Sequence, residues 1–254
     1  MIARISTVVG LLVWTIALSP LLAQAPAAEG PSPGGFWHGA VVLPTGDLEV
    51  SIDLEAGEDG VGSATIDLPA LGIRYMKLPE ATVDGASVLL RLIGMPGEPT
   101  FNGSLSEDGQ TIAGNFVQGQ QFFPFTLERT AMPEGFGDLT ALYADYEKPG
   151  TPGEGLVGTW RGLLDIGPIK LRIILDVTAG EDGTLTANVE GVDREQQVPA
   201  SSVTLGEDRA VAVDMSTVGV RYAGTMNEDG SEIAGEWKER AAPLPLIFKR
   251  AASE

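Results

Sequence analysis

The chain has 254 residues, no cysteine, and 35 acidic against 16 basic side chains, which give a net charge of −19. The missing cysteine excludes disulfides, thiol nucleophiles and thiolate metal ligands. A surface this acidic repels nucleic acid and anionic lipid head groups, so we expect neither as a partner. Solubility outside the cytoplasm explains the charge more simply than recognition of a cationic partner does.

Residues 1–25 have the parts of a secretory signal. Arg4 supplies the positive start, an apolar run follows, and small residues between positions 23 and 28 offer cleavage sites. Pro20 interrupts the apolar run before it reaches the roughly 20 residues that a membrane-spanning helix needs, so an uncleaved anchor is the weaker alternative. An exported protein without disulfides suits bacterial export better than eukaryotic secretion, which predicts a periplasmic or extracellular bacterial protein. We expect residues 26–33 to be disordered, and no stable membrane insertion after the signal is removed.

The remainder of the chain contains an internal repeat. Five blocks recur in the same order, two of them 123 residues apart and three of them 121 residues apart. The matching blocks are 35–39 with 158–162, 56–60 with 179–183, 107–109 with 228–230, 112–116 with 233–237, and 123–129 with 244–250. The constant order and the small drift in spacing indicate a duplication. The sequence therefore predicts the same domain twice, at residues 34–130 and 157–251.

Each copy has the pattern of short antiparallel strands. Apolar and polar residues alternate over 48–55 in the first copy and over 169–177 in the second, and a period of two indicates strands with one buried face. Glu-Asp-Gly tripeptides fall between such runs, where glycine can adopt the positive φ that closes a hairpin. About eight runs per copy predict an antiparallel meander, which closes into a barrel or splits into two sheets.

Residues 131–156 join the copies and are rich in proline and glycine, as linkers are. Within them, Asp138 is a good N-cap for a short helix, because apolar residues follow it at helical spacing up to Tyr146. We expect the apolar side of this helix to pack on a barrel. A role as a docking helix for a partner protein is the alternative.

The two ends of each copy carry complementary residues. The first strand opens with Gly-x-Trp, at Trp37 and Trp160, and the last strand ends in arginine, at Arg129 and Arg250. A guanidinium over an indole contributes about 0.5–2 kcal/mol and would join the two strands that must meet when a sheet closes. The fold class expected is therefore all-β, with two tandem antiparallel up-and-down barrels of about eight strands each and a linker with a short helix.

These motifs resemble those of the lipocalin and wider calycin barrels, which implies a ligand-binding barrel. The span from Trp37 to Arg129 is 93 residues and that from Trp160 to Arg250 is 91 residues, shorter than a typical lipocalin, so any cavity should be small. The second copy also resembles the small β module that precedes the catalytic domain of some exported bacterial α/β-hydrolases. That likeness is carried by residues 158–162, 171–177, 198–203, 222–225 and 234–246.

Catalytic and metal-binding patterns are not found in the sequence. There is no Gly-x-Ser-x-Gly elbow, and His38 is the only histidine, better explained as a polar strand residue than as a general base. One histidine without cysteine makes a zinc site improbable. The carboxylates of the Glu-Asp-Gly tripeptides could attract calcium, but no loop with alternating aspartates exists and a turn already explains them. We therefore predict no catalytic residue, no metal and no cofactor.

Aromatic residues on the inward parity are the candidates for lining a ligand cavity, with core filling as the more common alternative. They are Phe101, Phe116, Phe123, Phe125, Tyr222, Trp237 and Phe248. Pro124 and Pro245 repeat in the closing strand on the opposite parity. Because proline cannot donate to a strand ladder, we expect this strand to be bulged or incompletely paired on one side.

The functional hypothesis is a non-catalytic exported protein that binds a small apolar ligand or a peptide at a barrel mouth or an open seam. The alternative is an accessory module that interacts with an exported hydrolase or an envelope assembly. An enzyme of unknown type is the third hypothesis.

Overall fold

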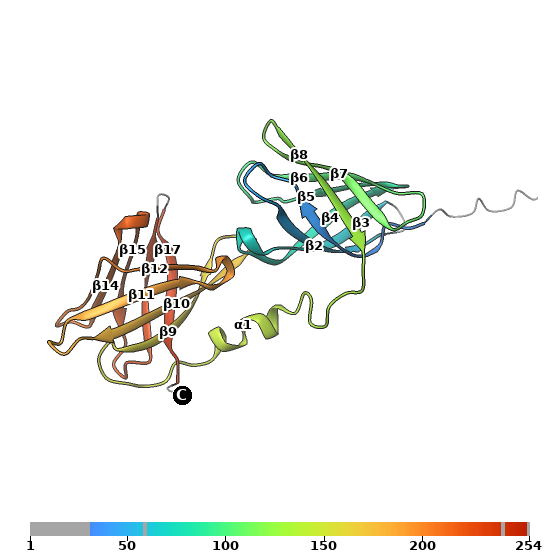
Figure 1. Ribbon diagram of the computed structural model, residues 1–254. Coiled ribbons are helices and arrows are strands. Elements are labelled where there is room, and N and C mark those ends of the chain that lie inside the picture. The colour runs from blue at the N-terminus through green and yellow to red at the C-terminus, as the bar shows by residue number, and fades with distance from the viewer. Residues whose placement is uncertain (1–30, 58–59, 240–241, 253–254) are drawn as a thin grey trace, which may run out of the picture.

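The computed structural model describes residues 31–57, 60–239 and 242–252, which form two antiparallel β units side by side (Figure 1). The predicted signal at 1–25, and residues 26–30 of the segment expected to be disordered, lie outside the described residues. The first unit comprises β1 (Gly35–Val41), β2 (Leu48–Glu55), β3 (Val61–Leu68), β4 (Ile73–Asp84), β5 (Ser87–Arg91), β6 (Thr100–Leu105), β7 (Thr111–Gln118) and β8 (Gln121–Arg129). The second comprises β9 (Gly158–Asp165), β10 (Lys170–Ala179), β11 (Leu185–Gly191), β12 (Gln196–Pro199), β13 (Ser202–Leu205), β14 (Ala210–Met215), β15 (Val220–Met226), β16 (Glu232–Lys238) and β17 (Leu244–Arg250).

The first unit is a closed barrel in which each strand pairs with its neighbours in the sequence. The barrel closes between β1 and β8, where the register runs from Trp37 opposite Arg129 to Val41 opposite Phe125. Buried and outward-facing residues alternate along β2, so that one face of the strand fills the interior. The prediction of an antiparallel eight-stranded barrel is confirmed for this copy.

The second unit is a curled sheet of nine strands in the order β12-β11-β10-β9-β17-β16-β15-β14-β13. It has one strand more than predicted because the counterpart of β4 is divided into β12 and β13. In β4, Ala81 and Thr82 pair with both neighbouring strands, whereas β12 pairs only with β11 and β13 only with β14. Between the two short strands, Ala200 N donates to Ala187 O and Ser201 N donates to Asp214 O, so the chain itself connects the two edges of the sheet.

The closing strands are incompletely paired at their prolines, as the sequence predicts. β17 pairs with β9 only over Phe248 to Arg250, which leaves Pro245 outside that ladder. In the first barrel Pro124 also lies just beyond the residues of β8 that pair with β1, and its carbonyl accepts a hydrogen bond from Val42 N. The opening between sheet edges lies elsewhere, between β12 and β13.

The linker contains the predicted helix, α1 (Leu139–Glu147), which lies under the junction of the two units (Figure 1). The Asp138 carboxylate caps it by accepting a hydrogen bond from Ala141 N at 3.0 Å. Tyr143 and Tyr146 are buried, and the Tyr143 hydroxyl donates to Lys170 O at the start of β10. The helix therefore packs on the second unit, as expected.

Two short 3₁₀ helices bring the units into contact, η1 (Pro69–Leu71) after β3 and η2 (Val192–Arg194) after β11. A methyl group on Gly72 of the first unit would lie 2.9 Å from Arg194 Cγ and 3.1 Å from Leu171 Cδ2 of the second. On the linker side, the Phe136 ring packs at 4.7 Å from Phe36 and 4.9 Å from Tyr75. A third 3₁₀ helix, η3 (Ser216–Val218), joins β14 and β15.

Candidate functional site

One end of each barrel is closed by the tryptophan and arginine that the sequence singles out. Trp37 and Trp160 are both 0 % exposed. The guanidinium carbon of Arg129 lies 4.2 Å from the centre of the Trp37 ring, and that of Arg250 lies 4.1 Å from the Trp160 ring. The first and last strands thus meet at the same pair of residues in both copies.

Each of these arginines also binds three backbone carbonyls, and among the described residues neither has a carboxylate partner. Arg250 donates from Nε to Gly230 O at 2.8 Å and from its two terminal nitrogens to Val157 O and Gly155 O. Arg129 makes the corresponding bonds to Gly109 O, Gly34 O and Ser32 O. The arginine therefore ties the last strand to a Glu-Asp-Gly turn and to the segment that leads into the first strand, which is a structural role.

In the first barrel the candidate lining residues are core residues. Phe101 is 4.8 Å from Phe116 and 5.2 Å from Phe125 between ring centres, and all three are buried. The space left beside Phe101 and Phe125 is about 10 Å³, which is enough for no more than one water molecule. Phe123 is half-buried at the side of this core. Of the two alternatives that the sequence offered for these four residues, core filling fits this packing, and a role in lining a ligand cavity stays an untested prediction.

The three candidate lining residues of the second barrel lie in different surroundings. The Tyr222 ring packs 5.0 Å from Phe248, and the Tyr222 hydroxyl donates to Ile233 O and approaches Leu246 O at 3.2 Å. Burial raises the pKa of Tyr222, so the hydroxyl stays protonated as a donor. Both residues belong to the core. Trp237 alone lines a pocket of useful size.

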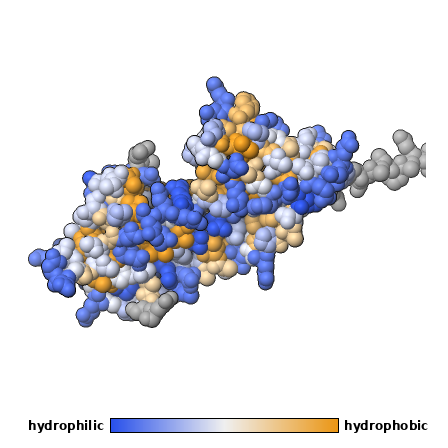
Figure 2. Space-filling model, viewed as in Figure 1, coloured by the Kyte–Doolittle hydropathy of each residue, from blue (hydrophilic) through white to orange (hydrophobic). Residues whose placement is uncertain are grey.

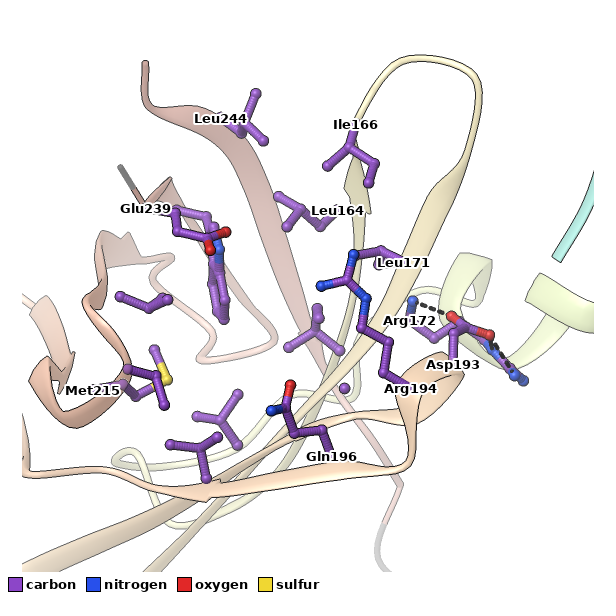
Figure 3. A pocket seen from close by; sticks show the side chains of 17 residues that line it. Leu164, Ile166, Leu171, Arg172, Asp193, Arg194, Gln196, Met215, Glu239 and Leu244 are labelled. Atoms are coloured by element: carbon purple, nitrogen blue, oxygen red, sulfur yellow. Dashed lines mark hydrogen bonds and ion pairs between the residues drawn. The ribbon is translucent and has the colours of Figure 1, made fainter. Parts of the chain in front are cut away.

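That pocket occupies the mouth of the second barrel, opposite the tryptophan and arginine, and has a volume of about 320 Å³. This volume lies at the lower end of the range of small-molecule sites. Its walls are largely apolar side chains of β9, β10, β11, β14 and β15, among them Leu164, Leu171, Ile173, Val189, Met215 and Val220. Trp237 of β16 completes the lining, and Figure 3 shows the side chains around the open space.

Polar groups lie on one side of the pocket and at its rim. Asp193 of η2 holds Arg172 by bonds of 2.9 Å to Nε, 2.7 Å to a terminal nitrogen and 2.7 Å to the backbone N–H. This pair turns Arg172 away from the pocket, whereas Arg194 and Gln196 extend towards its middle (Figure 3). Glu239 lies across the pocket from them. A ligand would therefore meet an apolar interior with a few polar groups near the entrance.

Two positions that line the pocket carry different residues in the two copies of the repeat. With the shift of 123 residues, Gly191 corresponds to Leu68 and Gln196 to Ile73, and the strand registers around them agree with that shift. Leu68 and Ile73 are both 0 % exposed and fill the mouth of the first barrel. The substitution of glycine for leucine at an aligned position is the signal in the sequence that could have located the pocket.

His38 takes no part in this site. Its Nδ1 lies 3.1 Å from Ser51 Oγ and its Nε2 lies 4.0 Å from a Glu49 carboxylate oxygen, on the exposed outer side of β1 and β2. It lies in the first barrel, whereas the pocket belongs to the second. The interpretation of His38 as a polar strand residue fits this position.

The aspartates of three Glu-Asp-Gly turns accept hydrogen bonds within their own turns, whereas Glu58 and Asp59 of the remaining turn lie outside the described residues. Asp108 accepts a hydrogen bond from Ser106 Oγ, which lowers the pKa of Asp108, and Asp182 accepts one from Thr184 N, which lowers its pKa. Asp229 has the same kind of contact. Over residues 31–57, 60–239 and 242–252, no group of three or more His, Cys, Asp or Glu side chains could hold a metal ion. Nor does any helix in this part of the chain have the length and apolar character needed to cross a membrane.

No protein-family model matches this chain, and no curated protein matches it. Three solved structures are similar over most of its length. A DUF3598-family protein of unknown function from Nostoc punctiforme is 12 % identical, with 86 % of this chain and 96 % of that chain covered and a TM-score of 0.24. A protein of Bacteroides fragilis titled as a candidate outer membrane protein is 16 % identical, with 86 % and 95 % covered and a TM-score of 0.24. An agglutinin of Burkholderia oklahomensis is 10 % identical, with 88 % and 82 % covered and a TM-score of 0.18.

Scores this low do not bear on function, so the class of the protein rests on its own strand pairing. It is a tandem all-β protein with a closed, filled barrel and a curled barrel that has a pocket in its mouth.

Proposed function

We propose that this protein is an exported, non-catalytic binding protein that takes a small, largely apolar molecule into the mouth of the second barrel. The observation that carries the proposal is the apolar pocket of about 320 Å³ at a place that the first barrel fills with leucine and isoleucine. A pocket of this size and lining suits a compact molecule with one or two polar groups. Export rests on the signal pattern of residues 1–25.

Burial of apolar surface would supply the affinity. Each square ångström of apolar ligand surface removed from water contributes about 25 cal/mol. Arg194, Gln196 and Glu239 would orient the polar end of the ligand, because they are the polar side chains that line the pocket without being held in the Arg172–Asp193 pair.

The test uses the neutral fluorophore N-phenyl-1-naphthylamine, whose emission rises in apolar surroundings. The wild-type protein should bind it saturably. Gly191→Leu should weaken binding at least about tenfold, because the leucine occupies ligand space. A methyl group at Gly191 would have only Gln196 O within 4 Å, at 3.9 Å, so the backbone can accept the change.

Matched controls separate filling of the pocket from general effects of the substitution. Gly206→Leu makes the same change in the turn between β13 and β14, where an added methyl group also meets only ordinary contacts. Gln196→Ile should weaken binding, whereas Gln197→Ile, on the neighbouring residue that approaches Glu190 outside the pocket, should not. Equal binding by wild type and Gly191→Leu, or no saturable binding by wild type, would contradict the proposal. Co-purification of an exported partner in that case would favour the accessory-module alternative.

A further inference from the structure

A second cavity lies outside both barrels, in the groove where they meet. It has a volume of about 390 Å³ and is bounded by β4 of the first barrel, by α1, and by the β9–β10 loop with the start of β10 of the second. Hydrophilic residues gather at the junction of the two units on the face drawn in Figure 2. The groove shares no lining residue with the pocket in the barrel mouth.

The charged side chains that line this groove are mostly positive, whereas the protein as a whole is negative. Lys77 of the first barrel and Lys170 of the second both line it, and in the described part of the chain neither ammonium group has an ion pair or side-chain hydrogen bond. The carboxylate among the lining residues is that of Glu147. Arg74 also lines the groove, with its Nε held 2.8 Å from Asp67 Oδ1. Two free ammonium groups thus face one carboxylate in a chain whose net charge is −19.

The backbone of β4 is distorted where it borders the groove. The register between β3 and β4 shifts between Ile66 and Leu68, and Tyr75 has φ of 50°, a left-handed conformation that is costly for a tyrosine. The Asp67 carboxylate holds this bulge by accepting bonds from both Arg74 Nε and Tyr75 N. Bulges redirect side chains, and they are frequent beside binding sites.

The second copy has no such bulge at the corresponding place. With the shift of 123 residues Tyr75 corresponds to Val198, which pairs regularly with Val189 in the ladder between β11 and β12. The bulge is therefore no requirement of the shared fold. It occurs in the copy whose β4 borders the groove, where it places Arg74 and Tyr75 among the lining residues.

We propose that this groove binds a small, soluble phosphate monoester. Lys77 and Lys170 would contact the phosphate from the two barrels, and Arg74, fixed by Asp67, would add a third positive charge. A doubly charged anion matches this excess of cations better than a single carboxylate does, and lysine binds phosphate as a point charge. Tyr75 and Tyr143 would contact the organic part. Bound in this way, the ligand would also fasten the two barrels to one another.

The test is calorimetric titration of the full chain with phenyl phosphate at low ionic strength. Inorganic phosphate and benzoate serve as comparison probes. Phenyl phosphate should bind saturably and more tightly than either. Lys77→Gln and Lys170→Gln should each weaken its binding about tenfold, because each removes one charge-assisted contact. The matched control is Lys238→Gln, which makes the same change in charge on β16 and should leave binding unchanged.

Three results with the soluble probes would overturn the inference. They are absence of saturable binding, an equal loss in Lys238→Gln, and unchanged binding in a variant that carries both Lys77→Gln and Lys170→Gln. All of these lysines are exposed, so a thermal melt should show each variant folded like wild type. Vesicles of phosphatidylcholine with phosphatidic acid form a further arm. Binding to these vesicles without binding to phenyl phosphate would assign the groove to a lipid head group and also overturn it. Failure here leaves the barrel-mouth proposal untouched, because the probes and variants differ.

Discussion

The two barrels share one topology and one closed end but differ at the opposite end. In the first barrel β4 runs without interruption and overlaps both neighbours, and the mouth is filled by Leu68 and Ile73. In the second the same strand is divided into β12 and β13, and the mouth holds a pocket. The comparison shows that the tryptophan and arginine end maintains the barrel, while the mouth is free to vary.

The largest effect is expected where the copies are alike. Trp160→Ala should lower the free energy of unfolding by about 3–5 kcal/mol, because removal of a fully buried indole leaves a cavity that neighbours fill only in part. Trp37→Ala should do the same in the first barrel. Urea denaturation followed by circular dichroism measures both. Phe122→Ala, at a side chain that is 68 % exposed, is the control and should change stability by less than about 0.5 kcal/mol. A small loss at either tryptophan would show that the two closed ends are not equivalent.

The next effect concerns the filled mouth. Leu68→Ala should cost about 3 kcal/mol, since leucine in a packed core cannot be truncated without leaving a void. Leu71→Ala, three residues later on η1 and 41 % exposed, provides the matched change. Similar unfolding energies for the two variants would contradict the view that Leu68 fills the first barrel.

Two glycines from turns with the same sequence should respond differently to alanine. Gly183 and Gly230 both have positive φ, at 79° and 67°, so either substitution strains the backbone by about 1–2 kcal/mol. At Gly183 nothing lies within 4 Å of the added methyl group, whereas at Gly230 it would clash with Gly153 O. Gly230→Ala should therefore cost at least about 1 kcal/mol more, because the clash disturbs the bond from Gly153 N to Asp229 O. Equal melting temperatures for Gly183→Ala and Gly230→Ala would show that the linker at Gly153 does not restrict the turn at Gly230.

The smallest effect on stability is expected from filling the hollow mouth. Gly191→Leu should raise the free energy of unfolding by about 0.5–1 kcal/mol, because it restricts the unfolded chain and the native backbone can accept a side chain. The measurement is the same denaturation series. A loss of stability would show that the pocket is already too small for leucine and would weaken the proposed site.

The sequence by itself determined the features that depend on local periodicity and on the repeat. Alternation over 48–55 and 169–177 places the strands, Asp138 begins the helix, and the recurrence of Gly-x-Trp with a closing arginine indicates which strands meet. The strands and the helix follow from residues that are close in the chain. The meeting of the first and last strands follows from the tryptophan and arginine, which come together when the sheet closes.

Only the tertiary structure decided which interior is hollow. Whether Phe101 lines a cavity or fills a core depends on the summed volumes of side chains from several strands, and parity alone reports only that it points inward. The same holds for Gly191, whose importance appears only when the mouth is seen around it. The groove at Lys77 and Lys170 depends further on how two barrels pack against each other, and no local pattern in either copy contains that information.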